Sequence, residues 1–181
     1  MRTRSFAFAV SLLCVCFVTA SMAQQQQEDK SKRPSPPGQA QVSLKGQTIT
    51  IDYSRPFMRG RKIMGGLVPY GKVWRTGANE ATTLTTPVDL NIGGTKVRAG
   101  KYTLWTLPSA GAWKLIINKQ TGQWGTNYDP KQDLARVDMQ KTSLSAPVQE
   151  FTMSFNKKGD DSADLVMQWE TTSVSVPIKA E

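Results

Sequence analysis

Alternating polar and apolar residues predict β-strands throughout the chain beyond residue 40. In TITIDY, residues 48–53, the side chains of Ile49, Ile51 and Tyr53 fall on one side of an extended chain and polar side chains fall on the other. The whole sequence predicts about nine or ten strands and no convincing helix. In the second half of the chain the strand-like segments are 135–141, 149–155, 163–170 and 173–178.

Turn residues separate the predicted strands at intervals typical of a β-sandwich. A turn at Lys45–Gly46–Gln47 precedes the strand at 48–53, and Gly93–Gly94 lies between two β-rich runs, where both glycines can adopt a positive φ in a hairpin. Segments 101–107 and 113–118 form a further pair. We therefore expect an all-β fold, a single antiparallel β-sandwich with Greek-key-like connections, with a partly open β-barrel as the alternative.

The stretch from Val97 to Tyr102 carries a local signal for the same fold. A tyrosine that follows a glycine-containing turn and leads into a strand is typical of the tyrosine corner of β-sandwiches. We expect the hydroxyl of Tyr102 to form a hydrogen bond with the backbone a few residues upstream.

Residues 54–71 predict a long loop, because two prolines and four glycines interrupt any alternation there. Loops longer than about 12 to 15 residues are uncommon in compact domains and are often functional. This segment is therefore the first place to look for a site.

The amino-terminal end predicts export and a short linker. Two arginines, an apolar run and small residues at Ser21 and Ala23 are typical of a secretory signal peptide over residues 1–23, which places the protein in the periplasm or outside the cell. Residues 24–38 are polar and lack aromatic side chains, so we expect a disordered tether. The remaining residues, 39–181, form one domain of a common size. The apolar run is too short for a transmembrane span.

The residue types that are missing narrow the possible chemistry. The chain has no histidine, and Cys14 and Cys16 both lie in the segment predicted to be removed. The mature protein therefore lacks the ligands that bind zinc, copper or haem tightly, and it lacks Ser–His and Cys–His nucleophile pairs. We expect no metal and no cofactor, we assign no catalytic residue, and we favour a non-catalytic role.

The charge of the chain is compatible with an acidic partner and also with a solvated basic surface that has no dedicated partner. The formal net charge is +9, and subtracting Arg2 and Arg4 with the signal peptide leaves +7. Such a protein can associate with an anionic small molecule or an acidic polysaccharide. Nucleic acid is not expected as a partner, because an exported protein seldom meets it. The sequence does not determine the oligomeric state.

Cations and aromatic side chains alternate between residues 53 and 83 with one acid among them. An arginine binds a carboxylate, sulfate or phosphate with two parallel hydrogen bonds, and tyrosine and tryptophan rings stack on sugars. These parts fit a site for an anionic, carbohydrate-like ligand. The candidate ligand-binding residues are Tyr53, Arg55, Arg59, Arg61, Tyr70, Trp74, Arg75, Asn79 and Glu80. Residues 123–129 are a weaker candidate, because their composition is that of a turn.

Other interpretations of these residues stay open. Arg75 can pair with Glu80, and Arg55 with Asp52, in which case the charges are structural. A hydrolase can use two carboxylates such as Asp52 and Glu80, and a lyase can use Tyr53 or a lysine. A structural or protein-interaction domain of the cell envelope is the third alternative.

Several motifs resemble those of a known family. The block YSRPFMRGRKIMGGLVPYGKVWRTGANEATTL, residues 53–84, is followed by AGKYTLWTLP, QWGTNYD and, near the carboxyl end, WETTSVSVPI. Together they resemble the exported bacterial family called domain of unknown function 2911, over residues 36–178. The resemblance implies an exported β-rich bacterial domain and brings no established activity, substrate or catalytic residue.

Overall fold

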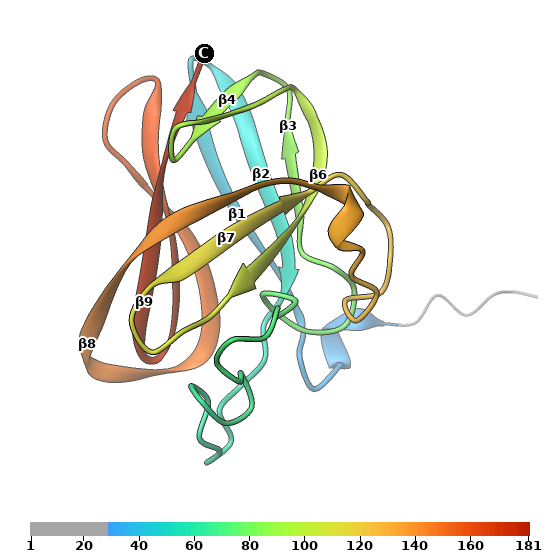
Figure 1. The fold of residues 1–181 in the computed structure, drawn as a ribbon, viewed down its shortest axis with the longest axis vertical. Coiled ribbons are helices and arrows are strands. Elements are labelled where there is room, and N and C mark those ends of the chain that lie inside the picture. The colour runs from blue at the N-terminus through green and yellow to red at the C-terminus, as the bar shows by residue number, and fades with distance from the viewer. Residues whose placement is uncertain (1–28) are drawn as a thin grey trace, which may run out of the picture.

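The computed structural model describes residues 29–181 and shows an all-β domain, as expected (Figure 1). It contains nine strands and, within those residues, no α-helix. Two single 3₁₀ turns occur, η1 at Lys30–Lys32 and η2 at Pro130–Gln132. The strands are β1 (Pro37–Leu44), β2 (Gln47–Ser54), β3 (Thr83–Thr86), β4 (Leu90–Ile92), β5 (Thr95–Val97), β6 (Gly100–Leu107), β7 (Trp113–Asn118), β8 (Asp133–Lys157) and β9 (Ser162–Ala180).

All neighbouring strands are antiparallel and follow the order β1-β2-β3-β6-β7-β8-β9-β4-β5. The sheet folds over on itself, and its two halves enclose the core between them (Figure 1). It does not close into a barrel, because β1 and β5 are the two ends of the strand order. The sandwich expectation is therefore confirmed over the barrel alternative.

The long strand β8 joins the two halves of the sheet. Its first residues pair with β7 as far as Met139, and from Gln140 onwards it pairs with β9. Register shifts between Ser143 and Thr152 let the strand bend. The predicted strands at 135–141 and 149–155 are thus parts of one strand, and those at 163–170 and 173–178 are likewise one strand, β9.

The core is one continuous cluster of side chains from both halves of the sheet. The alternating residues Ile49 and Ile51 of β2 are fully buried, as the pattern predicts. The largest buried side chains are Trp113, Trp169 and Phe151. Truncating an aromatic core residue such as Phe151 to alanine typically costs about 3 to 5 kcal/mol.

Two predicted turn features are confirmed in the structure. Gly93 and Gly94 have φ values of 54° and 89° in the β4–β5 hairpin, and a Cβ on Gly93 would lie 2.1 Å from Cγ1 of Val137, so only glycine fits there. The hydroxyl of Tyr102 donates a hydrogen bond of 3.0 Å to the backbone oxygen of Arg98, which is the predicted tyrosine corner.

The predicted loop is confirmed and extends from residue 55 to residue 82, between β2 and β3. It hangs below the sheet in Figure 1, yet it is well anchored. Ile63 and Val68 are fully buried in the core. The backbone of Trp74 exchanges two hydrogen bonds with Thr106 of β6, at 2.8 and 3.0 Å. The loop therefore presents its side chains from a fixed backbone.

Residues 29–38 fall within the predicted tether, but they contact the domain. The backbone oxygens of Pro34, Ser35 and Pro36 accept hydrogen bonds from the loop, and β1 already begins at Pro37. The predicted signal peptide and residues 24–28 lie outside the described residues. From residue 29 onwards, no helix is long and apolar enough to cross a membrane.

Candidate functional site

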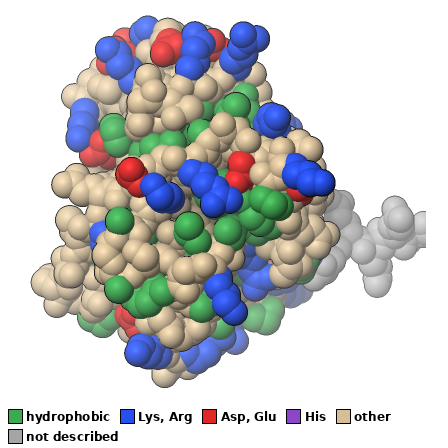
Figure 2. All heavy atoms as spheres, viewed as in Figure 1, with side chains coloured by type: hydrophobic (Ala, Val, Ile, Leu, Met, Phe, Trp, Pro, Cys, Tyr) green, Lys and Arg blue, Asp and Glu red, His purple; other side chains and the backbone are tan. Residues whose placement is uncertain are grey.

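A cleft of about 490 Å³ lies where the loop 55–82 meets the sheet. Its walls come from this loop, from Trp105 of β6, from Trp169 of β9 and from the segment between β7 and β8. Ser35 of the amino-terminal segment also contributes. In Figure 2, basic side chains lie among apolar patches over the lower part of the visible face, where the loop hangs below the sheet. The cleft thus combines aromatic walls with cations.

Arg75 lines the cleft and has no hydrogen-bond or ion-pair partner among the described residues. Its side chain is half-buried and lines the cleft, and within residues 29–181 its guanidinium makes no hydrogen bond or ion pair. Gly125 packs against it: a Cβ on this glycine would lie 2.9 Å from Cδ of Arg75 and 2.5 Å from the backbone oxygen of Asn79. The glycine is what allows the arginine to extend along this wall.

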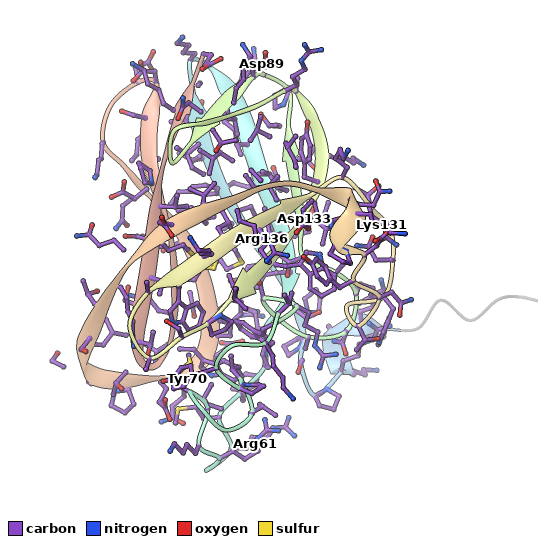
Figure 3. The ribbon with its side chains drawn as sticks, viewed as in Figure 1. Arg61, Tyr70, Asp89, Lys131, Asp133 and Arg136 are labelled. Carbon is purple, nitrogen blue, oxygen red and sulfur yellow. The ribbon has the colours of Figure 1, made fainter. Side chains whose placement is uncertain are left out.

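Arg61 is the second cation of the cleft, and it has a structural role as well. Its Nε and Nη2 atoms donate to the backbone oxygens of Met58 and Phe57, at 3.1 and 2.7 Å. The side chain is exposed and has no carboxylate partner among the described residues. Figure 3 shows Arg61 and Tyr70 at the loop end of the molecule, opposite the end that carries Asp89.

Trp74 is held in an aromatic cluster. Its ring stacks on Trp169 with centroids 5.8 Å apart and an interplanar angle of 20°, and it meets Phe151 edge-on at 5.0 Å. Such pairs contribute about 0.5 to 1.5 kcal/mol beyond the area that they bury. The indole is therefore a rigid part of the cleft wall, with limited freedom to reorient.

Tyr128 also lines the cleft and packs on Trp105, with ring centroids 5.0 Å apart. Its hydroxyl donates to Oδ2 of Asp133 at 2.6 Å and accepts from Nη2 of Arg136 at 2.9 Å. Burial and the hydrogen bond to the Asp133 carboxylate together raise the pKa of Tyr128 to about 12. Asp133 and Arg136 lie close together near the start of β8 in Figure 3.

Glu80 lies outside the cleft lining and forms ion pairs with cations other than Arg75. Its carboxylate pairs with Lys30 at 2.8 Å and with Arg33 at 2.9 and 3.0 Å. Partial burial raises the pKa of Glu80, but hydrogen bonds from Lys30, its own backbone and Arg33 outweigh this and lower it to about 2. The ion pair between Arg75 and Glu80 that the sequence allows is not formed.

The other ion pair suggested by the sequence is also replaced. Arg55 lies 3.3 Å from Glu150 and donates to the backbone oxygen of Pro37, whereas Asp52 accepts a hydrogen bond of 2.7 Å from Gln39. Asp52 and Glu80 line a separate hollow of about 180 Å³. Within residues 29–181 no group of three or more acidic, histidine or cysteine side chains is placed to hold a metal ion.

The structure brings three of the nine candidate residues to the cleft, namely Arg61, Trp74 and Arg75. The other six lie elsewhere. Tyr53 is buried in the core, where its hydroxyl accepts from the backbone N–H of Met153, and Tyr70 is an exposed residue of the loop. Arg55, Arg59 and Glu80 hold backbone or charge partners outside the cleft lining, and Asn79 donates to the backbone oxygen of Ser35.

Most of the cleft lining is absent from the predicted set. The absent residues include Trp105, Thr126, Tyr128 and Trp169. Thr126 and Tyr128 belong to the stretch 123–129, whose turn composition conceals its contribution. Trp105 and Trp169 sit in regular strands, where alternation marks them as ordinary core residues. No local signal shows that the edge of each tryptophan reaches a cleft.

Comparison with known proteins supports the family and nothing finer. No curated protein and no solved structure matches the chain. The family model described as "Protein of unknown function (DUF2911)" matches residues 35–178, which include the whole loop, the cleft walls and nearly all of the sheet. The chain therefore belongs to this family of unknown function, DUF2911.

Proposed function

We propose that this protein is an exported, non-catalytic binding module that takes an anionic or carbohydrate-like ligand into the cleft beside Arg75. The observation that carries the proposal is the unpaired guanidinium of Arg75 in the cleft wall. A partly buried charge without a counter-charge is unfavourable, and an anionic ligand removes that cost. The planar guanidinium of Arg75 can also donate two parallel hydrogen bonds to a carboxylate, phosphate or sulfate.

The aromatic walls supply the second part of the recognition. Trp74 and Tyr128 are both partly exposed in the cleft and are both held by neighbouring rings or hydrogen bonds. When a flat ring binds against such rigid surfaces, the side chains of the protein lose little conformational freedom. The volume of about 490 Å³ lies within the range of small-molecule sites.

The lining favours binding over acid–base catalysis. No carboxylate and no lysine lines the cleft among the described residues. The hydroxyl of Tyr128 is engaged with Asp133, and its raised pKa makes it a poor base near neutral pH. Glu80, with its pKa lowered to about 2, stays ionised and cannot act as a general acid.

Ligand binding is tested by titration calorimetry and thermal shift of the purified protein. Organic carboxylates, phosphates and sulfates are compared with neutral molecules of similar size, and Arg75→Gln is compared with Arg98→Gln, which removes an exposed arginine outside the cleft. We expect anions to bind, and we expect their binding to weaken as the salt concentration is raised. In Arg75→Gln, but not in Arg98→Gln, the affinity for anions should fall at least about tenfold. Equal binding of anions and neutral controls would contradict the proposal.

Export is a separate part of the proposal and has its own test. The motif at residues 1–23 supports it. Cell fractionation followed by amino-terminal sequencing is expected to find a protein that begins at Gln24 in the periplasm or the medium. An intact amino terminus in the cytoplasm would contradict export without affecting the binding proposal.

A further inference from the structure

The side chains that line the cleft are rich in hydrogen-bond donors and poor in acceptors. From this, and resting on the proposed function, we propose that the ligand is a hydroxyl-poor organic anion: one carboxylate-type head at Arg75 on a flat, apolar body. Sugar acids, which carry several hydroxyls, lie outside this ligand class.

The donors come from the charged and aromatic side chains. Arg61 and Arg75 offer only N–H groups, and the indole of Trp74 offers one N–H that has no partner within residues 29–181. None of the lining residues is an aspartate, glutamate, asparagine or glutamine. The only side-chain acceptors are therefore hydroxyl oxygens.

Those hydroxyls are few, and one is already used. The hydroxyl of Tyr128 donates a hydrogen bond to Asp133 and accepts one from Arg136. The hydroxyls of Ser35 and Thr126 remain as side-chain acceptors for a ligand. Each sugar hydroxyl carries a proton that needs an acceptor when it leaves water. A buried polar group that loses its hydrogen-bond partner weakens binding. A uronate with several hydroxyls would therefore find few side-chain acceptors for them in this cleft.

The apolar lining favours the opposite kind of body. Pro56, Leu67 and Val73 lie around the cleft together with the tryptophan walls, and Leu67 is 47% exposed. Covering such apolar surface with an apolar body removes it from water and strengthens binding. A planar hydrocarbon or aromatic body can meet this lining without any unpaired polar group.

Four probes separate charge from hydroxyl content. They are 2-naphthoate (anionic, apolar), 2-naphthamide (neutral, apolar), galacturonate (anionic, hydroxyl-rich) and galactose (neutral, hydroxyl-rich), each titrated into the purified protein. We expect 2-naphthoate to bind at least about tenfold more tightly than each of the other three. In Arg75→Gln its affinity is expected to fall at least about tenfold, with that for 2-naphthamide unchanged.

A second variant tests the apolar body while leaving the arginine in place. Leu67→Ser changes a half-exposed side chain of the cleft rim, so the fold should persist. Its melting temperature and that of Arg75→Gln are measured first. We expect Leu67→Ser to weaken 2-naphthoate and to leave galacturonate unaffected.

The outcomes distinguish this inference from the proposed function. If galacturonate binds as tightly as 2-naphthoate and depends on Arg75, the binding of anions stands and the hydroxyl-poor ligand class is overturned. If neither anion binds, or if binding does not depend on Arg75, both proposals are overturned.

Discussion

The carboxylate of Glu170 accepts a hydrogen bond of 3.2 Å from the backbone N–H of Ile63, a residue 107 positions earlier in the chain. Its other oxygen accepts from the N–H of Met64, also at 3.2 Å. Glu170 adopts a φ of 54° in β9, directly after the cleft residue Trp169. One side chain of the sheet thus holds the long loop at Ile63 and Met64.

Replacing Glu170 by glutamine is expected to loosen the loop. Hydrogen bonds to a charged group are worth roughly 1.5 to 3 kcal/mol, and the amide retains one acceptor, so we expect a loss of about 1 to 2 kcal/mol in the free energy of unfolding. Hydrogen exchange at the amides of Ile63 and Met64 should become faster. Asp138→Asn removes an exposed partner of Lys114 and serves as the control. Equal exchange rates in both variants would contradict this role of Glu170.

Replacing Glu80 by glutamine is expected to release the amino-terminal segment. Lys30 and Arg33 lose their shared carboxylate, so trypsin should cut after Lys30 and Lys32 more rapidly than in the unchanged protein. Asp138→Asn again serves as the control, because its ion pair lies elsewhere on the surface. Unchanged cleavage at Lys30 and Lys32 would show that other contacts hold this segment.

The same carboxylate predicts a pH dependence at the acidic end. The pKa of Glu80 is about 2 in the folded protein, below its ordinary value of 4.5, so its contribution to stability is complete above pH 4.5. That contribution is lost as the pH falls from 4.5 towards 2. Thermal melts of the unchanged protein and of Glu80→Gln should therefore differ above this window and converge at its lower end. A constant difference across the window would contradict the assignment.

Tyr128 is expected to dominate the alkaline end of a tyrosine titration. Its pKa is raised from 10.0 to about 12, so the stability that this raised pKa represents is present below pH 10 and lost as the pH rises through 12. Ultraviolet absorbance of tyrosinate should show a step near pH 12 that disappears in Tyr128→Phe. Tyr70→Phe, on the exposed side of the loop, should leave this step in place.

Replacing Gly125 by alanine is expected to disturb the cleft. The new Cβ would meet the backbone oxygen of Asn79 at 2.5 Å and the side chain of Arg75 at 2.9 Å. Overpacking of this kind typically costs about 1 to 3 kcal/mol. Both the melting temperature and the affinity for 2-naphthoate should fall. Gly111→Ala is the matched control, because a Cβ there has no neighbour within 4 Å, and an equal effect of the two changes would contradict the argument.

Local patterns in the sequence determined the fold class and several turns. Successive side chains of a strand point to opposite faces, so polar and apolar residues alternate along it. This alternation identifies strands such as 48–53 without knowledge of the strands that pair with them. A pair of glycines with positive φ and a tyrosine four residues from its acceptor are equally local. For this reason the hairpin at Gly93–Gly94 and the Tyr102 corner could be predicted.

The tertiary structure alone decided which residues share a cleft and which charges pair. Trp74 and Trp169 are stacked although 95 positions separate them, and Glu80 pairs with Lys30 and Arg33 and not with the nearby Arg75. Such choices follow from how the loop and the bent strands pack, and a charged side chain finds its partner in space. The composition of arginines and aromatic rings therefore pointed to a loop that lines a cleft, while the unpaired state of Arg75 is visible only in the folded chain.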